Sequence, residues 1–402
     1  MHVFRTAFCL VLAVLLGACE KAYEPVLGMP QTLENPTAGD VSGPRFSTGS
    51  DSRLALSWME PGESGTTLRY SPLVNGEFQD PVDVTTEPAM FVNWADLPSV
   101  SQMEDDHWVA HWLRYSAPKT YSYDVVVSQS FDDGKTWSSP LTAHTDGTPT
   151  EHGFVSTVLD VDGTSLLWLD GRNTPDQSMT LRSAVITRDG RRIHEQEIDN
   201  SVCDCCQTDI AIAENGPIAV YRDRSSEEIR DIYVTRFTHG RWQSGERLYA
   251  DNWHIPGCPV NGPSIVANGQ QVAVAWFSAA ADQPIVRVIR STDSGDSFGK
   301  AVEIASGRIS GYVGLAMLDD DSVAVSWVAT NEDRSNSVLV RHIDAAGHPG
   351  PAIRLGQSSQ LRLFPQLAYV DGHLYVAWTD QAVDKKILKL VRLTVSRRNQ
   401  SS

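Results

Sequence analysis

The segment "VAVAW" (272–276) recurs as "VAVSW" (323–327) and again as "LYVAW" (374–378), with 51 residues from each tryptophan to the next. Side chains alternate in character along each segment, which is the period of a β-strand with one packed face. The pattern returns four times nearer the N-terminus, as "LALSW" (54–58), "WVAHW" (108–112), "SLLW" (165–168) and "PIAVY" (217–221). The seven terminal aromatic residues lie 51 to 56 residues apart, so the chain contains seven copies of one unit.

The residues around each copy indicate what the unit is. A tight turn such as "ANG" (267–269) precedes the aromatic strand, and Asn-Gly favours a two-residue hairpin. An apolar strand comes before the turn, as in "GPSIVA" (262–267), and two more strands follow, as in "IVRVIRS" (285–291) and "KAVEIA" (300–305). Four antiparallel strands every ~50 residues are typical of a propeller blade. We therefore predict an all-β fold, a seven-bladed β-propeller.

The last copy lacks its fourth strand, because only the polar residues "SRRNQSS" (396–402) follow "ILKLVRLTV" (387–395). The N-terminal segment "PQTLEN" (30–35) is free to supply that strand and to close the ring, which removes an exposed sheet edge. We expect one propeller domain over residues 29–396, with 397–402 as a polar tail.

The N-terminus resembles a bacterial lipoprotein signal. An apolar run from Ala7 to Leu16 is too short to span a bilayer but suits a secretion signal. The sequence Leu16-Gly17-Ala18-Cys19 resembles a lipobox, which implies a signal peptide over 1–18, lipidation (palmitate among the acyl chains) at Cys19, and a tether over 19–28. Glu20 in place of Asp implies the outer membrane, so we expect a lipid-anchored protein of the cell envelope.

Composition restricts the partners. The formal charge of −17 and the pI near 5.0 exclude nucleic acid, because phosphates would be repelled. A small molecule, a glycan or a protein remains possible as ligand, and we expect a monomer.

Two segments carry a family resemblance. "SFDDGKTW" (130–137) and "STDSGDSF" (291–298) both read Ser-x-Asp-x-Gly-x-x-aromatic, and both fall between the third and fourth strands of their blades. This motif resembles the Asp-box, or BNR repeat, of sialidase-like propellers. The resemblance implies a structural role for the motif, since the Asp accepts turn N–H groups and the Gly takes positive φ. The family usually has six blades, which makes a six-bladed ring the alternative.

In a propeller, the loops leading into first strands share one face with the loops between second and third strands, where ligand sites gather. "CDCC" (203–206) leads into blade four and Cys258 into blade five. We therefore expect one sector of that face to bring together the following side chains: Cys203, Cys205, Cys206, Cys258, His152, His254, Asp170, Arg172, Arg222, Asp223 and Arg224.

Three interpretations of this sector remain open. Outside the cytoplasm the default is disulfides, with Cys258 bonded to one cysteine of the triplet. A second interpretation is a soft metal site for Cu or Zn, built from the four cysteines with His152 and His254. The third is a catalytic centre.

The resemblance to sialidases implies an arginine triad for a substrate carboxylate, with an acidic residue as acid. Arg172, Arg222 and Arg224 are the candidate clamps, and Asp170 or Asp223 is the candidate acid. Tyr221 replaces the tryptophan of other blades, so we expect it in the core. The family's Arg-Ile-Pro is missing, and "GPRF" (43–46) offers Arg45 in a different frame.

We therefore expect an envelope lipoprotein whose propeller binds a ligand or a soft metal ion at this Cys/Arg/Asp cluster. A sialidase-like exo-glycosidase acting on acidic glycans, and a disulfide-stapled scaffold without chemistry, are the alternatives.

Overall fold

The computed structural model describes residues 26–49, 53–104, 106–174, 177–360 and 363–396. The predicted signal peptide and Cys19 lie outside these residues. In the part of the chain that the structure describes, no helix is long and apolar enough to cross a membrane.

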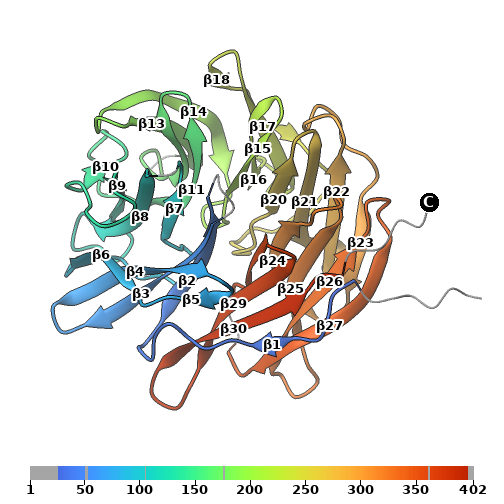
Figure 1. Ribbon diagram of the computed structural model, residues 1–402. Coiled ribbons are helices and arrows are strands. Elements are labelled where there is room, and N and C mark those ends of the chain that lie inside the picture. The colour runs from blue at the N-terminus through green and yellow to red at the C-terminus, as the bar shows by residue number, and fades with distance from the viewer. Residues whose placement is uncertain (1–25, 50–52, 105, 175–176, 361–362, 397–402) are drawn as a thin grey trace, which may run out of the picture.

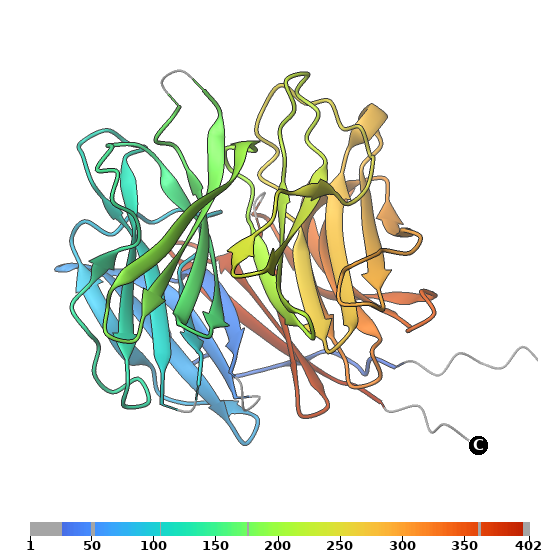
Figure 2. The same ribbon diagram turned by 90° about the horizontal axis from the view of Figure 1, so that it is seen from above.

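The described chain forms seven antiparallel sheets set around one axis (Figures 1 and 2), as the seven sequence copies predict. Blade one contains β2 (Ser42–Thr48), β3 (Leu54–Gly62), β4 (Gly65–Val74), β5 (Glu77–Phe78) and β6 (Val82–Glu87). Blade two contains β7 (Ser99–Gln102), β8 (Trp108–Tyr115), β9 (Tyr123–Ser130) and β10 (Leu141–Thr142). Blade three contains β11 (His152–Asp160), β12 (Gly163–Asp170), β13 (Met179–Thr187) and β14 (Arg192–Val202).

The second half of the chain repeats this order. Blade four contains β15 (Asp209–Ala213), β16 (Gly216–Arg222), β17 (Ile232–Thr238), β18 (Arg241–Trp242) and β19 (Glu246–Arg247). Blade five contains β20 (Ser264–Asn268), β21 (Gln271–Ser278), the short 3-10 turn η1 (Ala280–Asp282), β22 (Ile285–Ser291) and β23 (Val302–Ser306). Blade six contains β24 (Ile309–Met317), β25 (Val323–Thr330), β26 (Asn336–Ile343) and β27 (Pro349–Ser358).

The seventh blade closes the ring. It combines β28 (Gln366–Val370), β29 (His373–Gln381) and β30 (Lys386–Thr394) with β1 (Gln31–Thr32) from the other end of the chain. Gln31 lies opposite Arg392 in an antiparallel pair, which confirms the predicted N-terminal strand. Figure 1 shows β1 beside β30. The contact continues upstream, since Leu27 is buried against blade seven and forms a bridge with Val395.

The repeated aromatic residues form the core between the blades. All seven lie on second strands and are at most 3% exposed: Trp58, Trp112, Trp168, Tyr221, Trp276, Trp327 and Trp378. Burying a ring of this size stabilises a fold by several kcal/mol, so each blade is held to its neighbours by the residue that marks its sequence copy. Tyr221 is in the core, as predicted, and its hydroxyl donates to Asp199 at 2.6 Å.

The two Ser-x-Asp-x-Gly hairpins have one hydrogen-bond pattern. Asp132 accepts the backbone N–H of Thr136 at 2.8 Å, and Asp293 accepts that of Ser297 at 2.9 Å. The glycines that follow, Gly134 and Gly295, have φ of 76° and 85°, the left-handed region that these turns need. The motif residues therefore hold the hairpins between third and fourth strands.

Ring closure is testable by truncation. A protein beginning at Thr37 lacks β1, so the edge of β30 is exposed. A protein beginning at Val26 keeps β1 and its pairing with β30. We expect the shorter protein to unfold at a lower temperature and to aggregate, since an unpaired strand edge recruits other chains. Thermal unfolding followed by light scattering measures both effects, and equal curves for the two proteins would contradict the closing role of β1.

Candidate functional site

The first strands of the seven blades surround a pocket of about 320 Å³. Each blade, or the loop leading into it, contributes to the wall: Arg45, Asp96, Phe154, Asp209, Ser264, Tyr312 and Phe364 represent blades one to seven in turn. We call this space the central pocket. Concave sites of this size that combine apolar walls with a few polar groups are the usual ligand sites of proteins.

Three charged side chains meet in the central pocket. Arg45 interacts electrostatically with both Asp96 and Asp209. Its Nη1 donates to the carbonyl oxygen of Val155 at 3.1 Å, which directs the guanidinium across the channel from blade one toward blade three.

Asp96 is 2% exposed, and its two oxygens differ. Oδ1 accepts the backbone N–H of Phe154 at 2.8 Å, whereas Oδ2 is buried and has no hydrogen-bond partner among the described residues. Burial raises the pKa of Asp96 to about 7, although the Phe154 N–H and Arg45 both lower it. A carboxyl group with such a pKa can hold a proton near neutral pH and release it to a ligand.

The carboxylate of Asp209 accepts more hydrogen bonds than that of Asp96. Its Oδ2 accepts from Ser264 Oγ at 3.0 Å and from the backbone N–H of Ile265 at 2.9 Å. Its Oδ1 accepts the backbone N–H of Ile210 at 3.0 Å. Burial raises the pKa of Asp209, and the three donors together with Arg45 oppose that shift. The pocket therefore contains two carboxyl groups in unlike surroundings beside one cation.

β-Bulges shape this end of the first strands. The registers shift between Ser42 and Arg45, between Gly153 and Ser156, and between Gly311 and Gly314. Bulges of this kind reorient side chains next to functional sites. Gly153 shows why a small residue is needed, because a Cβ atom there would lie 2.0 Å from Asp96 Oδ2.

Tyr312 and Phe364 line one side of the central pocket, and Trp94 lies beside them. The centroid of Phe364 lies 4.7 Å from that of Tyr312 and 5.5 Å from that of Trp94. A second pocket of about 450 Å³ adjoins this side and shares Leu97 and Phe364 with the central pocket. The two spaces together offer a continuous wall from the channel toward blades one and seven.

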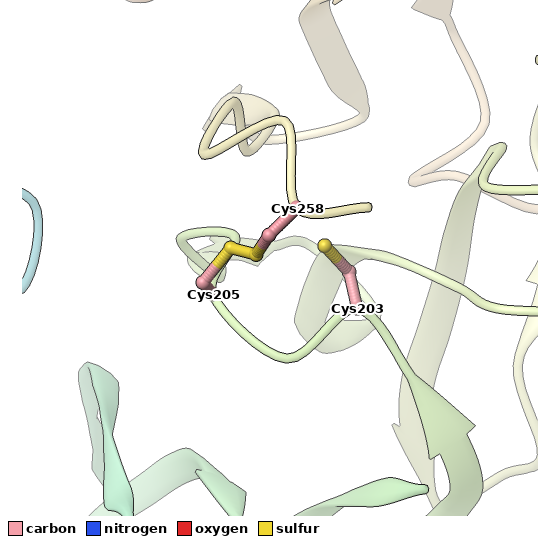
Figure 3. A group of neighbouring side chains, drawn as sticks. All are labelled: Cys203, Cys205 and Cys258. Carbon is pink, nitrogen blue, oxygen red and sulfur yellow. A yellow bond between two sulfur atoms is a disulfide. The ribbon is translucent and has the colours of Figure 1, made fainter. Parts of the chain in front are cut away.

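The four cysteines among the described residues are paired in two disulfides, Cys203–Cys206 and Cys205–Cys258. Figure 3 shows the bond between Cys205 and Cys258, with the sulfur of Cys203 turned toward it. The first bond closes the "CDCC" loop on itself, and the second joins blade four to the loop leading into blade five. Of the interpretations left open by the sequence, the disulfides are the one that the structure contains.

The structure places the charged loop of blade four beside the cysteines, as expected. Arg222 lies next to Cys203, whose backbone N–H donates to the Arg222 carbonyl at 2.9 Å. The Arg222 guanidinium, however, donates to three backbone carbonyls, those of Arg230 at 2.6 Å, Phe277 at 2.8 Å and Asn261 at 2.9 Å. Since its side chain is 1% exposed and stacks on Trp253, Arg222 holds loops together and cannot reach a substrate.

The other two residues of that loop are also engaged. Arg224 pairs with Glu228 at 2.7 Å and with Asp204 at 3.3 Å. Asp223 is 8% exposed, and burial raises its pKa to about 7. Neither residue lines the central pocket, so their catalytic roles stay predictions.

The remaining sequence candidates lie elsewhere on the face. Asp170 accepts from the indole N–H of Trp168 at 2.7 Å and from Arg172 Nη2 at 2.7 Å, which leaves both side chains occupied. His152 packs on His144 at the junction of blades two and three, and not on the cysteines. His254 is exposed and forms a backbone bridge with Ile229. The residues expected in a single cluster therefore form two separate groups. One contains His152, Asp170 and Arg172, and the other contains the four cysteines with the loops around Arg222 and His254.

Sequence reasoning noted Arg45 but missed Asp96 and Asp209. Asp96 lies just before β7, Asp209 begins β15 and Arg45 lies within β2, so all three are in or next to the first strand of a blade. That location was the available signal. Their meeting with Arg45 depends on the closing of the ring.

No family model matches the chain, and no curated protein matches it. Solved structures do resemble it. A polysaccharide lyase, described as an ulvan lyase bound to -[GlcA(1-4)Rha3S]-, has a TM-score of 0.56 at 11% identity over 92% of this chain and 98% of its own. The α-L-arabinofuranosidase of Fusarium graminearum bound to an iminosugar inhibitor has a TM-score of 0.52 at 11% identity, over 92% and 98%. The endosialidase of phage phi92 has a TM-score of 0.52 at 9% identity, over 93% and 70%.

At these identities the likeness shows the fold alone. The chain is a β-propeller of the architecture found in glycoside hydrolases and polysaccharide lyases, an endosialidase among them.

The raised pKa of Asp96 predicts how the free energy of unfolding depends on pH. Between pH 4 and 7 the folded protein keeps the Asp96 proton that the unfolded chain has lost, so stability falls as pH rises through that range. Asp96→Asn removes the buried charge and should make unfolding less dependent on pH there. We expect the variant to be more stable than the parent at pH 8, by at most about 4 kcal/mol. Denaturant unfolding at pH 4.5, 6 and 8 measures the difference, and parallel pH profiles would contradict the assignment.

The disulfide between blades is testable in the same way. Replacing both Cys205 and Cys258 by Ser should lower the free energy of unfolding by about 4 kcal/mol, the chain-entropy value for a loop of 53 residues. The two proteins should differ far less in a reducing agent, which serves as the control. Equal stability without reductant would mean that this bond does not constrain the chain.

Proposed function

We propose that the protein binds glycans at the central pocket and cleaves a glycosidic bond there. The observation that carries the proposal is Asp96, a carboxyl group buried in the central pocket, with one oxygen that has no hydrogen-bond partner among the described residues and a pKa of about 7. The fold shared with glycoside hydrolases and lyases supports this choice over the other ligands expected from the sequence.

The residues suggest distinct roles for the two carboxyl groups. Asp96, protonated near neutral pH, would give its proton to the glycosidic oxygen as the bond to the anomeric carbon breaks. Asp209, whose ionised form is favoured by three hydrogen-bond donors and by Arg45 against the effect of burial, would accept a proton from the water that adds to that carbon. Arg45 interacts electrostatically with both carboxyl groups and favours the ionised form of each.

The aromatic side of the pocket supports a sugar ligand. Trp94, Tyr312 and Phe364 present ring faces and edges on which the apolar face of a sugar ring can pack. The adjoining second pocket extends this surface and contributes Lys386. Because Arg45 and Lys386 give each pocket one cation, acidic glycans such as sialosides and uronic acid polymers belong in the substrate panel beside neutral ones.

We propose that Cys19 carries a lipid and that the propeller is a monomer held at the bacterial outer membrane, in reach of polysaccharides. The lipobox-like Leu16-Gly17-Ala18-Cys19 supports this placement. We also propose that the hairpins at 130–137 and 291–298 are Asp-boxes, on the strength of their matching hydrogen bonds.

The catalytic proposal is tested with a panel of neutral and acidic oligosaccharides, by the appearance of new sugar ends. For a substrate that is cleaved, Asp96→Asn should lower kcat at least 100-fold with little effect on glycan binding. Asp162→Asn, at an exposed turn, is the matched control and should act like the parent. Full activity of Asp96→Asn would exclude Asp96 as the acid, and binding without cleavage across the panel would make the protein a glycan-binding module.

A soft metal ion is the second candidate ligand, favoured by one observation. The sulfur atoms of Cys203, Cys205 and Cys258 all lie within 4.8 Å of one another. On reduction, these thiolates and Cys206 would suit Cu(I) or Zn²⁺. The reduced protein should then bind one metal ion per chain, measured by elemental analysis, and Cys258→Ser should weaken that binding. Failure of the reduced parent protein to retain any metal would remove this candidate.

A further inference from the structure

The two disulfides differ in what they link. The Cys205–Cys258 bond, here called the outer disulfide, joins the loop before blade four to the loop before blade five. The Cys203–Cys206 bond, here called the inner disulfide, links residues only three positions apart. A cross-link constrains the unfolded chain less as the closed loop becomes shorter. Holding the fold together therefore accounts for the outer disulfide better than for the inner one.

The two disulfides also differ in exposure. Cys203 and Cys206 are 0% and 1% exposed, whereas Cys258 is exposed and Cys205 is half-buried. Access to the sulfur atoms is one of the factors that decide how fast a thiol opens a disulfide. A thiol in solution can therefore reach the outer disulfide, while the surrounding chain shields the inner disulfide.

The sulfur of Cys203 brings the two disulfides into contact. Its Sγ lies within 4.8 Å of the Sγ atoms of both Cys205 and Cys258. Figure 3 shows this sulfur turned toward the outer disulfide. Two groups held so close in a folded chain react as if each were present at very high concentration. A thiolate formed at the outer disulfide would therefore lie next to the inner one.

A guanidinium group lies at the same sulfur. Arg230 Nη1 donates to Cys203 Sγ at 3.5 Å, and the Arg230 side chain is 3% exposed. Glu228 holds this side chain, since its Oε2 accepts from Arg230 Nη2 at 2.9 Å. When a thiolate attacks a disulfide, the negative charge spreads over the attacking, central and leaving sulfur atoms. A buried cation beside the central sulfur stabilises that charge.

We propose that these cysteines form a site for thiol–disulfide exchange, with Arg230 beside the sulfur that is attacked. A dithiol in solution reduces the outer disulfide: its own two sulfurs become bonded to each other, and Cys205 and Cys258 become thiols. The Cys258 thiolate then attacks Cys203 Sγ. The Cys203–Cys258 bond forms and the Cys203–Cys206 bond breaks. Cys206 leaves as a thiolate and takes up a proton, which balances the proton that Cys258 lost.

The exchange keeps blades four and five joined. Cys203 and Cys205 both belong to the segment between β14 and β15, so a Cys203–Cys258 bond spans the same junction as the outer disulfide. One equivalent of dithiol leaves that link in place, with thiols at Cys205 and Cys206, and a second equivalent is needed to remove it. The four cysteines do not line the central pocket, so the exchange does not depend on glycan cleavage.

The first test uses the oxidised parent protein at pH 8, with a chelator present so that no metal ion occupies the thiols. Dithiothreitol is added in portions below one equivalent, free thiols are trapped with N-ethylmaleimide after acidification, and peptides are mapped by mass spectrometry. Molecules that have lost one disulfide should contain a Cys203–Cys258 bond, with label on Cys205 and Cys206. One-bond molecules that contain only Cys203–Cys206 or only Cys205–Cys258 would overturn the proposal.

A pair of variants isolates the sulfur of Cys258. Cys205→Ser and the double variant Cys205→Ser/Cys258→Ser both lack the outer disulfide, but only the first keeps a thiol beside Cys203. Dithiothreitol should reduce the remaining disulfide about tenfold faster, or more, in Cys205→Ser, because Cys258 passes the attack to the shielded bond. Near-ultraviolet circular dichroism checks that both variants are folded. Equal rates in the two folded variants would also overturn the proposal.

The contribution of Arg230 has its own readout. Arg230→Gln should slow reduction of the inner disulfide about tenfold relative to the outer disulfide of the same molecule, since only the inner one loses its cation. Arg191→Gln, at an exposed arginine, is the matched control and should keep the ratio of the parent. A general loosening of the loop would speed both reductions. An unchanged ratio in Arg230→Gln would overturn the part assigned to Arg230.

Discussion

The pairing of β1 with β30 is the contact on which the rest of the structure depends. It joins residues more than 350 positions apart, Gln31 and Arg392, and turns seven similar sheets into a closed ring. In a closed ring the first strand of each blade faces a common axis, and the loops that lead into those strands meet on one face. Without closure, Arg45, Asp96 and Asp209 would have no reason to meet, because they belong to three different blades.

Closure also explains the electrostatics of the central pocket. Seven sheets packed by large aromatic residues leave a narrow channel, in which a buried charge is poorly solvated. Burial therefore raises the pKa of Asp96 and of Asp209, and the guanidinium of Arg45 offsets part of that shift. The Asp209 carboxylate accepts three hydrogen bonds and the Asp96 carboxylate accepts one, so the two groups have unlike surroundings. Unlike surroundings for two carboxyl groups are the usual basis of acid–base chemistry.

The charged residues outside the pocket mostly hold loops and blades together. Arg222 bridges three backbone carbonyls from two blades, and Asp170 binds the indole of Trp168. The Cys205–Cys258 disulfide performs the same task covalently between blades four and five. The loop over 221–231, rich in Arg and Asp, thus chiefly holds blades four and five together. Its contacts lie outside the central pocket.

The order of strands along the chain, the number of blades and the closing segment could all be predicted from the sequence, because each blade is built from contacts within ~50 residues and repeats its own pattern. The proximity of the cysteines to Arg222 followed from the same logic. The pairing of those cysteines, the partners of Arg222 and the meeting of Arg45 with Asp96 could not be predicted. They depend on side chains from different blades. The packing around the axis sets the distances between those side chains, and the spacing of residues along the chain does not.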